Sequence, residues 1–524
     1  MSASRFAAVV LAAVSGATAL LAQTDGTQAP ARAADLTRIN PKFLVTPEEA
    51  QSWHAAKDLL GPALSGNASW KVFMTIVEAK LREYGAVDLM KNAWTYDRWH
   101  TSEWPDDSQW SLVSNGKPLR VASYGANSGT TAASGVTADL VFYDPAKPPA
   151  SIEGKIVVFQ TVPEDENTPA DRRVYEYPGD YLYLSNAETF PDPRIPRKAN
   201  MTVMMRSEMR QATSYITKLV EGRAAGAIFV FDAAYERLAG LYTFGVPAIH
   251  QMPTLYVDRD AGRQLLADAK SGRKATLRLV AKVEPTETYQ LFAYLPGRDY
   301  GTSGDQKILL ITHTDGPSIS QDDGAYGILG IVRYFSRIPQ AQRPRTLMLF
   351  FDNRHYMPGA ERAFAKQNWM DQHPEAWNPV VGVIGIEHLG QLEYVEKNGV
   401  FKRTGLVEHS RLHATNNQLL IDMAIKAVKD NKLKRVSVEC VDRPGIHGTS
   451  QGNWFGLGAV GRRRGLPAFA TMGDMGAYWS TSARLASFDA QHFVDQVATM
   501  AQLTGELMVA DPEKVKPTPV AARE

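Results

Sequence analysis

From about residue 290 onward, continuous apolar runs alternate with amphipathic segments, and this pattern limits the possible folds more than any other feature of the sequence. Apolar runs of strand length predict strands that are buried on both faces, as in a parallel sheet. Amphipathic segments between them predict helices that cover that sheet. The predicted strands are 307–312, 345–351, 380–386, 435–441 and 466–471, and the predicted helices are 325–338, 360–370, 417–430 and 490–509. Before residue 290, helical periodicity spans 46–94, and a further helix is predicted at 214–225. The sequence therefore predicts an α/β fold with a mostly parallel sheet flanked by helices.

The first 22 residues have the features of an export signal. Arg5 precedes an apolar run, Phe6 to Ala22, which is rich in Ala, Val and Leu and short for a membrane span. A membrane anchor is the alternative interpretation of this run. We expect the signal to be removed and the mature protein to be secreted or periplasmic, without stable membrane association.

Charge and cysteine content exclude several kinds of site. Lys and Arg total 57 and Asp and Glu total 56, which gives a net charge of +1 and argues against a nucleic-acid partner. The basic run at 462–464 is interpreted as a solvated loop. Cys440 is the only cysteine, so an internal disulfide, a cysteine zinc cluster and an iron–sulfur site are excluded. Any metal must therefore be held by His, Asp and Glu.

Three predicted strand ends carry residues that suit a metal. Ligands of parallel α/β sheets bind beyond the carboxyl ends of the strands. His313 ends the first of these strands, Asp322 lies in the loop that follows it, and Glu387 ends the third strand. One imidazole and two carboxylates suit a divalent cation such as zinc. Asp315 is placed to orient His313, as a carboxylate behind a metal-binding histidine often does.

Four segments resemble the zinc exopeptidase family, metallopeptidase family 28, which contains double-zinc aminopeptidases, glutamate carboxypeptidases and glutaminyl cyclases. These segments are ILLITHTD, DDGAYG, RTLMLFF and VIGIEHLG. The resemblance covers about 40–110 and 290–508. The segments IEGKIVVFQ, AAGAIFVFD and MPTLYVDRDAGRQLL look like the protease-associated domain that is often inserted in this family.

This resemblance implies a division of the chain. The expected parts are a signal peptide at 1–22, a linker at 23–40, an N-terminal part of the peptidase-like domain at 41–114, an inserted, mainly β protease-associated domain at 115–288, the main peptidase-like domain at 289–510 and a tail at 511–524.

The resemblance also implies roles for individual residues. His313 matches the family's first-metal histidine, and Asp315 matches the carboxylate that orients it. Asp322 matches the aspartate that bridges two metals, and Asp323 matches its neighbour. Glu387 stands where the family usually has a first-metal aspartate. One metal's ligand set therefore matches the family pattern.

The second metal's ligand set does not match. Asn353 and Arg354 stand where the family has a general base and a second-metal glutamate, and Arg354 is a fixed cation that cannot bind a metal. Asp352 or His355 is the possible substitute. The family's late histidine falls on Trp479 or Ser480, depending on the register. A further departure lies at 450–452, where the family has Ser-Asp-His.

Two outcomes follow from this half-matched site. The leading hypothesis is an exported metallopeptidase-like hydrolase of peptide or amide substrates that holds one zinc ion, with Asp352 or His355 as the base and Arg354 as the oxyanion donor. The alternative is a catalytically inactive binding protein, in which Arg354 holds a carboxylate of a ligand.

A serine hydrolase is a minor alternative. Residues 448–452 fit the Gly-x-Ser-x-Gly pattern around Ser450, and Asp474 or Asp489 and then His492 follow in the order of that class. The pattern does not directly follow a predicted strand, which argues against this interpretation.

Overall fold

A computed structural model describes most of the chain between residues 34 and 518. The described residues are 34–163, 174–175, 182–184, 197–198, 201–242, 248–357, 368–440, 442, 454, 456–473 and 479–518. The predicted signal peptide and the predicted strand residue 441 lie outside this set, as do most residues of the predicted helix at 360–370. Within the described part, no helix combines the length and the apolarity that a membrane crossing requires.

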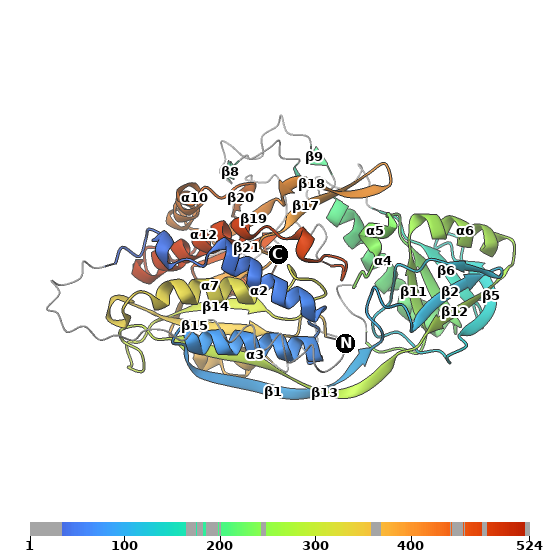
Figure 1. Cartoon of the computed structure of the whole chain (residues 1–524), viewed down its shortest axis with the longest axis horizontal. Helices are drawn as coiled ribbons and strands as arrows, with labels where there is room; N and C mark the ends of the chain where they lie inside the picture. Colours follow the sequence, from blue (N-terminus) through green and yellow to red (C-terminus); the bar gives the residue numbers. More distant parts are fainter. Residues whose placement is uncertain are drawn as a thin grey trace.

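A large twisted sheet forms the left-hand lobe in Figure 1. Its strand order is β1 (Val87–His100), β13 (Lys282–Leu295), β15 (Thr346–Asp352), β14 (Lys307–His313), β16 (Val380–Ile386), β21 (Ala468–Gly473), β19 (Ser410–Ala414), β20 (Val436–Glu439) and β8 (Leu182–Leu184). The four strands from β15 to β21 run parallel to one another. The α/β fold predicted from the alternating pattern is confirmed.

Helices cover the large sheet, which explains the continuous apolar strands. The helices of this lobe include α2 (Pro47–Leu60), α3 (Ala68–Glu83), α7 (Gly324–Ser336), α10 (Gln418–Asp430), α11 (Ala459–Arg463) and α12 (Ala490–Val509). Neighbouring residues of β14 enter different cores. Ile308 packs in the core that contains α7 and α12, whereas Leu309 packs in a second core with Trp377 and Trp454. Because both faces are buried, the middle of β14, from Ile308 to Ile311, is continuously apolar.

Two helical segments differ from the sequence prediction. The helical periodicity expected over 46–94 becomes two helices, α2 and α3, and then strand β1 from Val87. In β1 the exposed and half-buried residues alternate, as in a strand. Pairing with β13 therefore determines the conformation of this segment, and its local helical periodicity does not. Helix α4 (Met201–Glu221) begins well before the helix predicted at 214–225.

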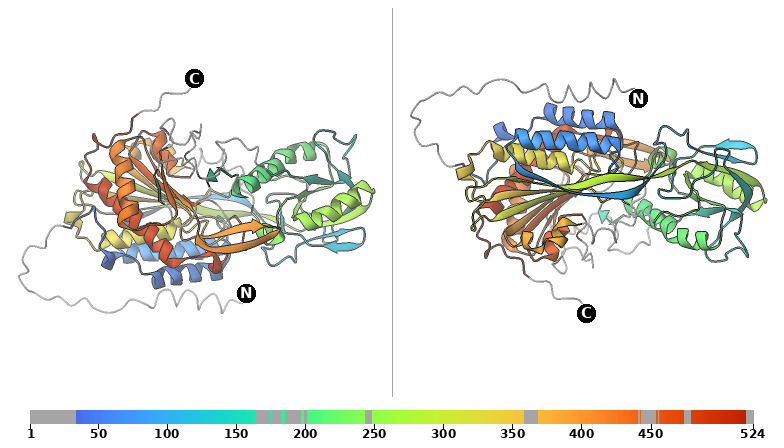
Figure 2. Two further views of the ribbon diagram at one scale, coloured as in Figure 1. Left: turned by 90° about the horizontal axis from the view of Figure 1, so that it is seen from above. Right: turned by 90° about the horizontal axis from the view of Figure 1, so that it is seen from below.

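A second sheet forms the right-hand lobe in Figure 1. Its order is β3 (Lys117–Leu119), β2 (Trp110–Ser114), β12 (Lys274–Leu279), β5 (Val136–Phe142), β6 (Ile156–Gln160), β10 (Gly226–Val230), β11 (Thr254–Val257) and β4 (Ser123–Tyr124). Helices α4 and α6 (Arg259–Lys270) lie against it (Figure 2). We call this lobe the insert lobe; its sheet draws strands from residues 110–279, compared with the 115–288 expected for an inserted domain.

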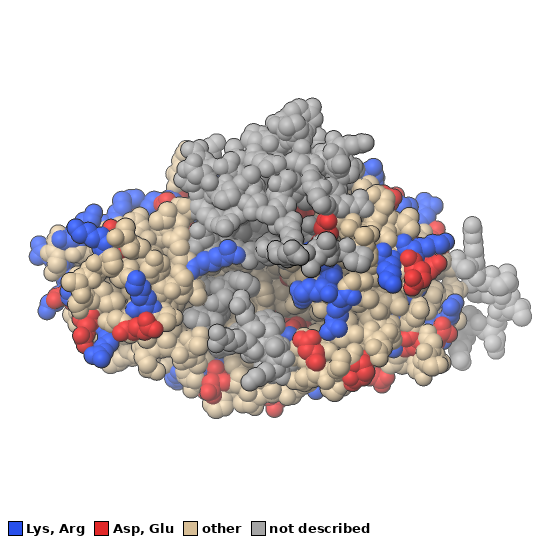
Figure 3. All heavy atoms as spheres, turned by 180° about the vertical axis from the view of Figure 1, so that it is seen from behind, with Lys and Arg blue, Asp and Glu red and all other residues tan. Residues whose placement is uncertain are grey.

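The paired strands β1 and β13 connect the two lobes. They pair antiparallel from Val87 opposite Tyr294 to His100 opposite Lys282, and they run along the lower edge of the molecule in Figure 1. On the face shown in Figure 3, positive and negative side chains are interspersed, in keeping with the balanced charge of the sequence.

Candidate metal site

The carboxyl ends of three neighbouring strands meet at one edge of the large sheet. β14 lies between β15 and β16 and runs parallel to both. His313 ends β14, Asp352 lies opposite it at the end of β15, and Glu387 directly follows β16. Polar residues from three separate segments are therefore concentrated where ligands of such sheets bind.

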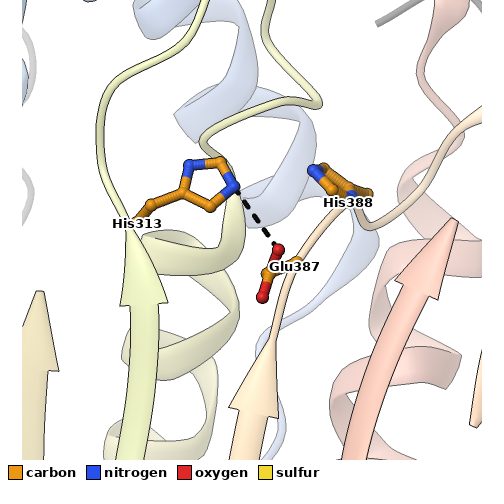
Figure 4. A group of neighbouring side chains, drawn as sticks. All are labelled: His313, Glu387 and His388. Atoms are coloured by element: carbon orange, nitrogen blue, oxygen red, sulfur yellow. Dashed lines mark ion pairs between the residues drawn. The ribbon is translucent and has the colours of Figure 1, made fainter. Parts of the chain in front are cut away.

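His313, Glu387 and His388 form a buried cluster at this edge (Figure 4). One possible ligand atom from each residue lies within 4.8 Å of the other two, and Nε2 of His313 is 3.6 Å from Oε2 of Glu387. No other group of this kind occurs among the residues that the structure describes. The φ angle of His388 is 58°, so the alternation of the extended strand ends here, and both Glu387 and His388 lie beside His313.

The chemistry of this cluster fits a divalent cation. Both ring nitrogens of His313 are buried and make no hydrogen bond to any described residue. Burial holds the pKa of His313 well below its usual value and lowers the pKa of His388 to about 3, so both rings are neutral. Burial also raises the pKa of Glu387 to about 7. Two neutral imidazoles and one carboxyl group are a donor set that zinc accepts.

Asp322, the expected bridging ligand, contacts a lysine instead of this cluster. Nζ of Lys57, in the last turn of α2, lies 2.5 Å from Oδ1 of Asp322, and both side chains are buried. Burial raises the pKa of Asp322 to about 7, although Lys57 opposes the shift. Asp323, at the start of α7, accepts a hydrogen bond from the Leu389 amide at 3.0 Å and faces Nε2 of His54 at 3.4 Å.

Asp315 holds the backbone that follows β15. One of its carboxylate oxygens accepts from the His355 amide at 3.1 Å, and the other accepts from the Tyr356 amide at 2.7 Å. Burial raises the pKa of Asp315 to about 8, and the nearby charge of Asp352 adds to this shift. The expected orientation of His313 by Asp315 stays a prediction.

Asp352 and Arg354 form a buried, two-pronged ion pair. Nε of Arg354 donates to Oδ1 of Asp352 at 2.8 Å, and Nη2 donates to Oδ2 at 2.6 Å. Nε2 of Gln290 also donates to Oδ1 at 3.1 Å. Both carboxylate oxygens of Asp352 are therefore already hydrogen-bonded, which leaves little capacity to accept a proton from water.

His355 lies directly against the metal-site cluster. Its ring stacks on the ring of His313, with centroids 4.2 Å apart and planes inclined by 15°. Burial and the neighbouring His313 hold the pKa of His355 well below its usual value. Of the two candidate bases, His355 is thus the one that contacts a residue of the cluster.

Residues 479–481, where the resemblance leads us to expect the family's late histidine, contact the insert lobe. Trp479 accepts a backbone hydrogen bond from Tyr242 at 2.9 Å, and the Thr481 amide donates to Gly240 at 2.9 Å. The Ser480 hydroxyl donates to the carbonyl of Ala239. These contacts tie the segment to the other lobe.

The residues named for a serine hydrolase are only partly described. Ser450 and Asp474 lie outside the described residues. His492 is buried near the start of α12, and its amide donates to Oδ1 of Asp489 at 2.8 Å, which is a helix-capping bond.

Two residues of the site were not selected from the sequence. His388 is adjacent to Glu387, and the pair Glu-His at a strand end was the available signal. Lys57 carries no local signal, because it lies 265 residues from Asp322 and reaches it only through the packing of α2 beside α7.

Several solved structures share this architecture. The peptidase M28 precursor from Shewanella amazonensis SB2B superposes with a TM-score of 0.59 at 15% identity, covering 91% of this chain and 97% of that chain. The chain has the zinc-exopeptidase fold. The zinc aminopeptidase BSAP from Bacillus subtilis has a TM-score of 0.55 at 10% identity, and the match covers 91% of this chain and 99% of that chain. The aminopeptidase from Aneurinibacillus sp. strain AM-1 has a TM-score of 0.51 at 13% identity, and the match covers 94% of this chain and 98% of that chain.

No family model matches the chain, and no curated protein matches it in sequence. At these identities the structural comparisons establish the zinc-exopeptidase fold, and the site residues must be argued from their own geometry.

Proposed function

We propose that this protein is an exported, zinc-dependent hydrolase of exopeptidase type that cleaves peptide or amide bonds and uses a single metal ion. The buried cluster of His313, Glu387 and His388 at the sheet edge carries the proposal. The named activities of the zinc aminopeptidases that share the fold support the same chemistry. The apolar leader at 1–22 supports action outside the cytoplasm.

Zinc, when bound here, would acidify a water molecule and polarise the carbonyl of the substrate. His313 and Glu387 would hold it. His355 is the proposed proton acceptor, because its ring stacks on His313 directly beside the cluster. Arg354 neutralises Asp352 and fixes the end of β15, so that His355 keeps its place. The protease-associated identity of the insert lobe is part of the same proposal.

The test measures hydrolysis by purified mature protein of a panel of aminoacyl p-nitroanilides and short peptides. We expect activity that a chelator removes and added zinc restores. His355→Gln should lower kcat by roughly 10²–10⁴-fold, the usual contribution of a general base, and should keep the zinc content. Equal activity of the chelated and zinc-loaded proteins would exclude the metal mechanism.

A binding protein is the second candidate, and the Asp352–Arg354 pair favours it. This pair occupies the strand end where the related family carries its base, and it is neutral as a unit. Zinc-loaded protein that binds short peptides in calorimetry but releases no product over the whole panel would support this function and contradict the hydrolase.

A further inference from the structure

Lys57 is a buried cation at a site where the resemblance would place a metal. Its side chain is 1% exposed, and Asp322 is fully buried. The ammonium lies 2.5 Å from Oδ1 of Asp322, donates to the carbonyl of Ser318 at 3.2 Å and lies 5.4 Å from the centre of the Phe73 ring. A carboxylate, a carbonyl and an aromatic face are all partners for a positive charge, so the pocket is built for the ammonium.

This ion pair changes what Asp322 can do for a metal. A carboxylate that bridges two ions needs both oxygens, and here one oxygen already contacts Lys57. A second divalent ion beside the ammonium would also be repelled by it. In keeping with this contact, Asp322 does not belong to the cluster of possible metal ligands formed by His313, Glu387 and His388.

His388 supplies the third donor atom that Asp322 does not. It belongs to the converging group with His313 and Glu387, and the amide of Gln321 lies 3.0 Å from its Nε2, which holds the ring in place. We infer that the site holds one ion through His313, Glu387 and His388, and that Lys57 stands in place of a second ion by neutralising Asp322. The inference rests on the proposed function only in requiring a bound divalent ion.

The experiment measures zinc stoichiometry and affinity on the purified chain by competition with a chromophoric chelator. His388→Asn removes the imidazole and keeps a residue that tolerates a positive φ. The double variant K57M/D322N removes both charges of the pair together, so that no charge is left buried alone. Circular dichroism checks that each variant is folded.

We expect one zinc per wild-type chain. His388→Asn should weaken zinc binding by at least the roughly 10–100-fold that loss of an outer partner of a metal ligand costs. The double variant should bind zinc as the wild type does. Two ions per wild-type chain, or wild-type affinity in His388→Asn together with a large loss in the double variant, would overturn the inference.

The two proposals can fail separately. One zinc with the expected variant pattern but no hydrolysis contradicts the hydrolase and leaves the one-ion site standing. Hydrolysis that depends on two bound ions supports the hydrolase and contradicts the one-ion site. No zinc bound by any form contradicts both.

Discussion

Arg354 and Asp352 neutralise one another inside the protein. Both side chains are almost fully buried, and two hydrogen bonds join them. Taking either charge out of water is expensive, so the pair is tolerated only because each partner satisfies the other. Removing one partner leaves an uncompensated buried charge, whereas removing both does not.

We therefore expect Arg354→Ala to lower the free energy of unfolding by about 3–5 kcal/mol. The double variant R354M/D352N should recover most of this loss. Urea denaturation measures both. Arg263→Ala is the control, since Arg263 pairs with Asp260 on an exposed helix face and should contribute less than about 1 kcal/mol. Equal losses in the single and double variants would show that packing, not charge, sets the effect.

Glu208 makes the stability of the insert lobe depend on pH. Its Oε1 accepts from the Thr161 hydroxyl at 2.8 Å and from the Asp232 amide at 2.7 Å, and burial raises its pKa from 4.5 to about 7. The folded protein thus keeps a proton that the unfolded chain loses. Stability from this group is fully present below pH 4.5 and is lost as the pH rises through about 7.

Glu208→Gln should remove this dependence, because the amide oxygen still accepts both hydrogen bonds. At about 1.4 kcal/mol per pKa unit, the variant should be more stable than the wild type by roughly 3–3.5 kcal/mol at pH 8. At pH 4 the two should be equal. Thermal unfolding across this pH range measures the difference, and a constant difference at every pH would contradict the explanation.

The residues that end a predicted strand could be named from the sequence, but their partners could not. His313 and Glu387 follow apolar strands, and the structure brings them together. The contact of Asp322 with Lys57 depends on how α2 packs, and no local pattern reports it. The pairing of Arg354 with Asp352 depends on side-chain geometry that only the folded strand end defines.

At the scale of elements, the turn before α11 positions Glu387. Gly456 has a φ of 85°, and a Cβ on it would lie 2.5 Å from Oε1 of Glu387. The next amide, of Leu457, donates to that same oxygen. The absence of a side chain at 456 is thus what allows this turn to approach the carboxylate.

Gly456→Ala should displace Glu387 and weaken zinc binding by about tenfold or more, by analogy with other losses of support for a metal ligand. Gly465→Ala is a matched control: its φ is 65°, and nothing lies within 4 Å of the added Cβ. Both changes carry a backbone penalty of about 1–2 kcal/mol, because alanine disfavours a positive φ, but only the first places its Cβ against Glu387. Equal zinc affinities of the two variants, measured by chelator competition, would contradict this role for Gly456.

Buried strands were the most predictable elements, and the paired strands β1 and β13 were the least. The predicted strand 380–386 coincides with β16, because a strand that is buried on both faces must be continuously apolar. β1 carries charged, polar and aromatic residues and is largely half-exposed. Its pairing with β13 supplies the backbone hydrogen bonds that make it a strand, and this long-range pairing leaves no local trace.

At the scale of the whole molecule, Trp479 joins the lobes. It belongs by sequence to the main lobe, but its side chain packs in a hydrophobic core of the insert lobe with Phe231 and Tyr256. Its carbonyl accepts a hydrogen bond from the Tyr242 amide, and two residues later the Thr481 amide donates to the Gly240 carbonyl. Trp479 is thus one of the main-lobe side chains that link the stability of the two lobes; Tyr356, which packs in another core of the insert lobe, is a second.

Trp479→Ala should lower the free energy of unfolding by about 3–5 kcal/mol and should split thermal unfolding into two transitions, because the lobes lose a core residue that they share. Trp454→Ala is the control. Trp454 is equally buried, at 5% exposure, but lies in a core of the main lobe. It should lower the transition temperature without splitting it. One unchanged transition for Trp479→Ala in calorimetry would show that the lobes are coupled elsewhere.

The paired strands β1 and β13 also bear on how a ligand would be selected. They hold the lobes together along one edge, while Trp479 holds them from within. To separate at Trp479, the lobes would have to pull an indole out of a packed core. We therefore expect the separation of the lobes to stay nearly constant when a ligand binds. We expect the protein to select ligands by their size and shape, because a ligand that does not already fit would find no closing or opening of the lobes to accommodate it.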